Sequence, residues 1–357
     1  MSSYASVGLL CVMGCILFFL PLIPAFRELR RKSDAEPLVV VQQHAGEIRF
    51  FADSFRSYLK SLGPTLEQCS RTGATASGTM PDGTEYIVYG QGDQGLLLPP
   101  SKEDQAVAAI IASATDLALP WQTTFSRDIY SAGDFFGGEK NNYRAVLAEK
   151  DVRLGEHSSV NRWVHAVGEF SADAGCKLFG RASSDRSIRL TTDCTFSRLN
   201  APRIATFDSD SATAPATEDT TYADESSAVL PRTLHDGDLE IPPGQVLRGN
   251  LVVRGKLRVG TGARIEGSVK SEKELVLESN VRVEGSLIST SKIVIGADCR
   301  IHGPIIAERA MRIASGTRCG SQAKPTTLSA PEIELETGVL VSGTLWARER
   351  GQVVRAL

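Results

Sequence analysis

The clearest pattern in the sequence is a regular recurrence of equivalent apolar positions in its carboxy-terminal third. The quartets RIEG, RVEG and RIHG begin at positions 264, 282 and 300, which defines an 18-residue period. The apolar columns are Leu247, Ile265, Val283, Ile301 and Cys319; Leu251, Val269, Leu287, Ile305 and Ala323; Leu257, Leu275, Ile293 and Met311; and Val259, Leu277, Ile295 and Ile313. Such a period is one coil of a β-solenoid. The pattern predicts an all-β, parallel β-helix over residues 237–357.

Two further features fit coils of this length. Glycine recurs at Gly249, Gly267, Gly285 and Gly303, which predicts a corner that needs backbone freedom or a close approach between coils. A loop around residues 324–329 lengthens one coil, after which the register resumes at Ile333 and Leu335. We therefore expect the solenoid to continue to the last residues of the chain.

The same period appears more weakly between residues 116 and 205. Its columns are Val152, Phe170 and Ile188; Leu154, Ala172 and Leu190; Ser158, Cys176 and Cys194; and Val160, Leu178 and Phe196. One earlier coil fits from about Leu117 if the register slips by one position. Residues 206–236 are acidic and rich in Ser and Thr, which predicts a linker. We expect this linker to loop out of one continuous solenoid.

The amino-terminal segment, up to residue 63, predicts two helices. Residues 7–26 are apolar and uncharged, long enough for a single transmembrane helix, and Arg27, Arg30, Arg31 and Lys32 follow them. That order predicts a cytoplasmic location for the bulk of the chain. A cleaved signal peptide and a lipobox at Cys15 are alternatives.

The second expected helix, over residues 37–63, is amphipathic and juxtamembrane. Its apolar positions are Ile48, Phe51, Phe55, Tyr58, Leu59 and Leu62. We expect it to pack on the adjoining domain, with membrane or partner binding as the alternative. Residues 64–115 are mixed: TEYIVYG suggests a strand, whereas Ser101 and Asp104 could cap a helix through AVAAIIA.

Composition and charge argue against some classes of function. The formal net charge is −3, so no overall electrostatic bias points to nucleic acid. The seven cysteines form no CxxC pair or Cys/His cluster, so no metal site and no cofactor are expected. Cys176 and Cys194, one period apart, are interpreted as stacked core residues.

Candidate chemistry on the good repeats is sparse. His302 points outward beside Glu284 and Glu266, and we interpret it as a solvated surface histidine because no oriented partner can be argued. No catalytic residues are expected. Hexapeptide acyltransferases also have 18-residue coils, but the apolar residue that they repeat every six positions is only partly present here.

Four arginines form one outward column. They are Arg264, Arg282, Arg300 and Arg318. This column could contact an anionic polymer or lipid surface. Pairing with Glu266 and Glu284 on neighbouring coils is the interpretation that we favour.

The short strands with VEGSLISTSKIVIG at residues 283–296, the glycine column and the 18-residue coil resemble the bactofilins, which are polymer-forming bacterial cytoskeletal proteins. The likeness covers residues 237–357. It implies a right-handed triangular β-helix, nucleotide-free polymerisation by end-to-end stacking, and a scaffold at the inner membrane linked to cell-envelope or morphology machinery. The membrane span and the first array depart from a small bactofilin.

The last coil is the expected assembly surface. Val341, Leu345 and Val353 occupy inward columns, Trp346 and Leu357 lie beside them, and no capping helix follows, which predicts an open strand edge. We therefore expect a membrane-anchored structural scaffold, not an enzyme, whose partners are other copies of itself, the inner membrane and cell-envelope proteins. A β-helix enzyme of the hexapeptide acyltransferase type, or an adaptor for an anionic polymer, is the alternative.

Overall fold

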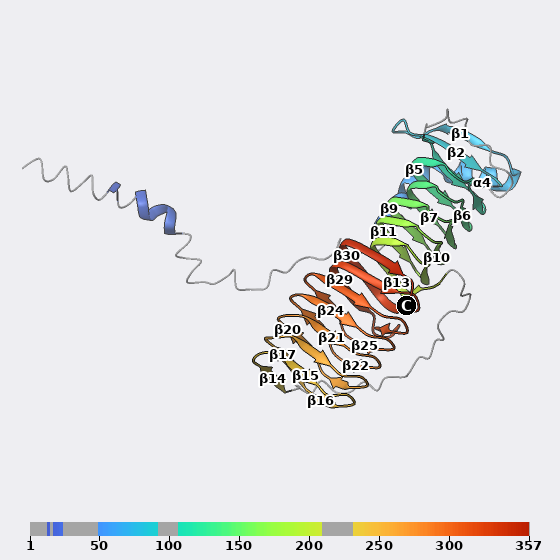
Figure 1. The fold of residues 1–357 in the computed structure, drawn as a ribbon. Helices are drawn as coiled ribbons and strands as arrows, with labels where there is room; N and C mark the ends of the chain where they lie inside the picture. The colour runs from blue at the N-terminus through green and yellow to red at the C-terminus, as the bar shows by residue number, and fades with distance from the viewer. Residues whose placement is uncertain (1–12, 15–16, 24–48, 92–105, 209–230, 357) are drawn as a thin grey trace, which may run out of the picture. The chain divides into compact units, whose positions relative to one another are not determined.

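The computed structural model describes residues 13–14, 17–23, 49–91, 106–208 and 231–356, in two units, Met1–Glu47 and Ile48–Leu357 (Figure 1). In the first unit one 3-10 turn, η1 (Leu20–Leu22), is described. Most of the span expected over 7–26 lies outside the described residues. Among those that are described, no helix has both the length and the apolar character that crossing a membrane requires.

The second unit is a parallel β-solenoid. Its described strands join one 30-stranded sheet, and nearly all neighbouring strands run parallel. This confirms the predicted fold class. The strands form two arrays, one on each side of the linker (Figure 1).

The second array winds through three faces, with one short strand per face in each coil. The first face holds β14 (Arg232–His235), β17 (Asn250–Val253), β20 (Val269–Ser271), β23 (Leu287–Ser289) and β26 (Ile305–Ala307). The second holds β15 (Leu239–Ile241), β18 (Leu257–Val259), β21 (Leu275–Leu277), β24 (Lys292–Ile295) and β27 (Ala310–Ile313). The third holds β16 (Val246–Arg248), β19 (Arg264–Glu266), β22 (Arg282–Val283), β25 (Arg300–Ile301) and β28 (Arg318–Cys319). Two long strands, β29 (Thr326–Glu336) and β30 (Leu340–Val354), complete the array.

The predicted columns are the observed strand register. Leu257 pairs with Leu275, and Leu275 with Ile293, and all three side chains are buried. One member of the columns is wrong: Ile305 pairs with Leu328, not with Ala323, which is exposed. The inserted loop carries Ala323 outward, and the register resumes after it, with Met311 paired to Ile333 as expected.

Close approach between coils explains the glycine column. A Cβ added at Gly285 would lie 2.5 Å from the backbone carbonyl of Gly267, and one added at Gly303 would lie 2.5 Å from that of Gly285. Within the column only Gly249 also has a positive φ. The corner therefore excludes side chains by space more than by backbone conformation.

The first array has two well-paired faces and begins earlier than expected. One face holds β3 (Ile110–Ser113), β5 (Thr124–Ser131), β7 (Asn142–Ala148), β9 (Ser159–Ala166), β11 (Lys177–Ser184) and β13 (Thr195–Thr206). The other holds β4 (Leu117–Ala118), β6 (Phe135–Gly137), β8 (Val152–Leu154), β10 (Glu169–Ala172) and β12 (Ser187–Leu190). The expected slip is present: Asn142 pairs with Thr124, a full period before it, and with Ser159, one position short of a full period after it.

Several expected boundaries shift. AVAAIIA contributes to strand β3 instead of a helix, because Ile111 and Ala112 are buried in the stack and pair with β5. TEYIVYG does form a strand, β2 (Glu85–Tyr89), which pairs antiparallel with β1 (Ala76–Thr79) and parallel with β3. The linker is shorter than 206–236, since β13 reaches Thr206 and β14 begins at Arg232.

The expected amphipathic helix packs on its own domain, as favoured. Its described part is α3 (Phe50–Leu59) followed by η3 (Lys60–Leu62), and Phe55, Leu59 and Leu62 are buried against the first array. The helical segment does not end at 63. Pro64 lies in the first turn of a second helix, α4 (Gly63–Thr72), a position that needs no N–H donor.

The described cysteines are buried and unpaired, as expected for core residues. Cys176 and Cys194 occupy one inward column and are fully buried. Burial raises the pKa of Cys299 to about 11, so this thiol stays protonated and unreactive at neutral pH.

Candidate functional site

The carboxy-terminal coil is paired within the chain. Strand β30 pairs in parallel with β29 on one side and antiparallel with β13 of the first array on the other (Figure 1). Val341, Leu345 and Val353 are each at most 1% exposed, and Leu357 lies outside the described residues. The expected open strand edge is therefore wrong. Trp346, 45% exposed, is the one described member of the proposed assembly set that reaches the surface.

The junction joins two carboxy-terminal coils. Leu199 faces Leu345, Ile204 faces Val341, and the Asn200 side-chain amide donates a 2.6 Å hydrogen bond to the Thr344 hydroxyl. The inward columns of both arrays belong to one apolar cluster across it. The expected continuous winding is also wrong, because β14 pairs with β17 and not with β13. The chain direction reverses where the two arrays meet.

Helix α3 covers the outer face of the first array, whereas at the amino-terminal end of that array strand β3 is extended by β2 and β1. Helix α3 and residues Leu62 and Met80 cover Trp163 and Ile110, which belong to strands of the first array. The Phe55 ring contacts the Trp163 ring edge to face at 5.7 Å between centroids. Two ion pairs hold the helix in place: Arg49 with Asp185, and Arg56 with Glu149, at 2.8 Å each.

The amino-terminal end of the second array is extended by no described strand. Strands β14, β15 and β16 each pair with one strand, those of the next coil, and no other described strand lies on their outer side. Leu234 and Val246 are 53% and 52% exposed there, and Leu239 and Leu247 only partly buried. We call strands β14–β16 the open coil. It combines unpaired backbone groups with exposed apolar side chains.

The open coil was not predicted from the sequence, although one residue in it indicates an unusual surface. Val246 takes the position that arginine fills in the next four coils, at Arg264, Arg282, Arg300 and Arg318. An apolar residue in an otherwise charged outward column marks a surface that water contacts less favourably.

The predicted arginine column exists, and part of it is paired. Arg264 lies 3.5 Å from Glu266 and 3.4 Å from Glu284, which confirms the favoured pairing for this residue. Arg282 and Arg300 form no ion pair with other described residues, so contact with an anionic surface stays a prediction for them.

His302 differs from its expected solvated state. Its side chain is only 14% exposed, and its Nδ1 atom is hydrogen-bonded to the Glu284 carboxylate on the preceding coil. An oriented partner therefore exists. The pair is explained by the coil register, which stacks position 302 on position 284.

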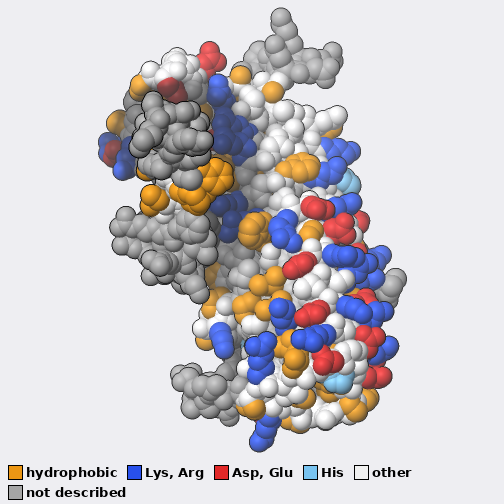
Figure 2. All heavy atoms as spheres, turned by 90° about the vertical axis from the view of Figure 1, so that its left-hand side faces the viewer, with side chains coloured by type: hydrophobic (Ala, Val, Ile, Leu, Met, Phe, Trp, Pro, Cys, Tyr) orange, Lys and Arg blue, Asp and Glu red, His pale blue; other side chains and the backbone are white. Residues whose placement is uncertain are grey.

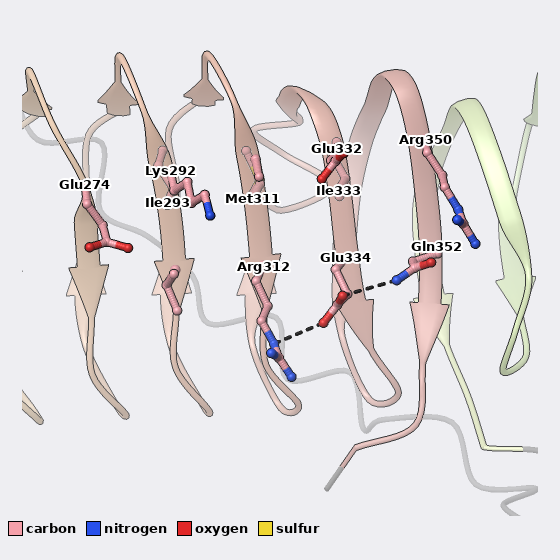
Figure 3. A pocket seen from close by; sticks show the side chains of 12 residues that line it. Glu274, Lys292, Ile293, Met311, Arg312, Glu332, Ile333, Glu334, Arg350 and Gln352 are labelled. Carbon is pink, nitrogen blue, oxygen red and sulfur yellow. Dashed lines mark hydrogen bonds and ion pairs between the residues drawn. The ribbon is translucent and has the colours of Figure 1, made fainter.

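A shallow pocket of about 380 Å³ lies over β24, β27, β29 and β30 (Figure 3). Its charged lining residues are Glu274, Lys292, Arg312, Glu332, Glu334 and Arg350, three acids and three bases. Arg312 pairs with Glu334 at 3.1 Å, and Gln352 donates a hydrogen bond to Glu334 at 3.2 Å. Acidic and basic side chains are therefore equal in number around the pocket, and its lining has no formal net charge.

In the described part of the chain, no group of three His, Cys, Asp or Glu side chains is placed to hold a metal ion. The fold and the open coil define a class: parallel β-solenoids built from two arrays joined at their carboxy-terminal coils. In comparisons with family models, with curated proteins and with solved structures, nothing matches this chain.

Proposed function

We propose that this protein is a structural scaffold and not an enzyme, anchored to a bacterial inner membrane by residues 7–26 and self-associating through its open coil. The open coil carries the proposal, because no described strand extends the second array beyond it and it exposes the apolar side chains of Leu234 and Val246. The bulk of the chain would face the cytoplasm and organise cell-envelope or morphology machinery, as the bactofilin resemblance implies. A right-handed coil is part of the same proposal.

The form of the assembly depends on which coil ends can pair with a second copy of the chain. The β13–β30 junction is an example, within one chain, of two coils burying their edges by antiparallel pairing. A chain that associates through this open coil alone can repeat the contact once, with the same surface of a second copy, which gives a closed dimer of twofold symmetry. We therefore expect dimers and no filaments.

The mass of the full chain in detergent tests this assembly. We expect light scattering to give twice the chain mass, and Leu234→Lys with Val246→Lys to give a single chain with an unchanged circular dichroism spectrum. Ile306→Lys is the matched control, because Ile306 is 42% exposed in the same column as Leu234 but lies on an inner coil. A monomeric wild type, or a double variant that dimerises like the wild type, would overturn the proposal.

Membrane attachment is tested separately. The chain should remain in the membrane fraction after carbonate extraction, since the uncharged stretch over 7–26 matches the hydrocarbon thickness. A reporter fused after residue 357 should be active in the cytoplasm, because the basic residues follow the span. Release by carbonate would remove the anchor from the proposal and leave the dimer untouched.

A further inference from the structure

Five arginines from consecutive coils lie close together on one face of the first array. Strands β5, β7, β9, β11 and β13 stack side by side, and Arg181 and Arg198 face outward in one register position. Arg127, Arg144 and Arg162 immediately precede the residues that fill this position in the earlier coils. We call these five residues the arginine strip. With about 4.8 Å between parallel strands, it extends roughly 20 Å along the stack.

The strip carries excess positive charge. Its one acidic neighbour in register is Asp128, which lies 3.3 Å from Arg144. Arg127 and Arg162 are exposed and form no ion pair with another described residue. In Figure 2, Lys and Arg side chains gather in the upper part of the view, over the first array, whereas acidic and basic side chains alternate in the lower part.

Exposed aromatic rings flank the strip. Trp346 faces Arg198 in register across the junction, with the guanidinium 5.4 Å from the ring centroid. Phe179, in β11, and Phe50, at the start of α3, are also exposed. Arginine beside exposed aromatic residues is typical of surfaces that lie on lipid headgroups.

The strip also lies where the chain enters this unit. The Phe51 ring is 5.2 Å from the Arg181 guanidinium, and Arg49 is bound to Asp185. Only residues 27–48 separate the expected membrane span from this point in the sequence. A short tether of this kind raises the effective concentration of the membrane surface at the strip.

We propose that the arginine strip binds the anionic headgroups of the membrane that holds the amino-terminal segment. This inference rests on the membrane anchoring given under Proposed function. Binding would lay one face of the solenoid along the bilayer, and the attraction would weaken with salt, because exposed charges are screened within about 10 Å at 0.1 M.

The test is the reactivity of single arginines in the full chain inserted into vesicles. Phenylglyoxal modification, followed by peptide mass spectrometry, is compared between phosphatidylcholine vesicles and vesicles that also contain phosphatidylglycerol. We expect Arg127 and Arg162 to react several-fold more slowly on the anionic vesicles, and this protection to disappear at high salt. Arg258 and Arg309, exposed on the second array, serve as internal controls and should not change.

A charge-reversal pair sharpens the test. Arg127→Glu with Arg162→Glu should abolish the lipid-dependent protection of Arg181 and Arg198, whereas Arg258→Glu with Arg309→Glu, an equal change in charge, should preserve it. Equal rates on both vesicles in a chain that resists carbonate would overturn this inference alone. Loss of the chain from vesicles under carbonate would overturn the anchoring and this inference with it. Protection by a DNA oligonucleotide but not by anionic vesicles would reassign the strip to an anionic polymer.

Discussion

Adjacent residues of one short strand carry very different shares of the stability. In β26, Ile305 is fully buried in the apolar core, whereas Ile306 is 42% exposed. We expect Ile305→Ala to lower the free energy of unfolding by about 2 to 5 kcal/mol, because it leaves a cavity in a close-packed column. Ile306→Ala should change it by about 0.5 kcal/mol or less. Chemical denaturation measures both, and equal losses would contradict the assigned faces of the strand.

A buried histidine ties stability to pH in the middle of the first array, in strand β9. His165 accepts or donates one hydrogen bond, at 2.9 Å between its Nδ1 atom and the Ser183 hydroxyl, and its Nε2 atom has no hydrogen-bond partner. Burial lowers the pKa of His165, although the nearby Asp185 carboxylate opposes this shift. Arg49, Arg56 and Asp53, in and next to helix α3, are the other charged groups that act on it.

The sign of the pH dependence follows from this lowered pKa. The unfolded chain, with a histidine pKa of about 6.5, binds the proton more tightly than the folded chain, so stability is complete above that pH and is lost as pH falls. We expect the wild-type melting temperature to fall more between pH of about 7.5 and about 5.5 than that of His165→Asn. The control is His157→Asn, an exposed site with positive φ that asparagine tolerates. Parallel falls in wild type and His165→Asn would contradict the assignment.

At the scale of elements, strand β30 is an internal part of the sheet. Leu345 is fully buried between β13 and β29, while the adjacent Trp346 points outward. Leu345→Lys should therefore cost about 3 to 5 kcal/mol of folding stability, because it buries an unpaired charge. Trp346→Lys should cost about 1 kcal/mol or less. If Leu345→Lys unfolded at the wild-type denaturant concentration, β30 would not be covered by β13.

At the scale of the whole molecule, the unit should be most stable at its middle and least stable at the open coil. Each coil of a solenoid is stabilised mainly by its neighbours, and the β14–β16 coil has one neighbour where β13 and β30 have two. In the single-chain variant Leu234→Lys with Val246→Lys, hydrogen exchange should be fastest in β14–β16 and slowest near the junction. In wild type, dimerisation should slow exchange in β14–β16 only. Slow hydrogen exchange in the open coil of the single-chain variant would show that another part of the chain covers these strands.

The sequence by itself determined the architecture of each array. An 18-residue period, with side chains alternating inward and outward, fixes which residues stack, because a strand offers only two faces and the coil length repeats. Leu257, Leu275 and Ile293 could be placed in one column without coordinates, and the slipped coil near Phe125 was visible for the same reason.

Only the tertiary structure decided which array ends are covered. The β13–β30 junction joins residues such as Leu199 and Leu345 that are far apart in the chain, and no local period encodes an antiparallel contact between two parallel arrays. The face of the first array that Phe55 and Leu59 cover likewise depends on where α3 lies, not on its pattern. Local periodicity determines which residues are neighbours within a stack. Which surfaces cover the ends of a stack depends on how much apolar surface each possible contact would remove from water.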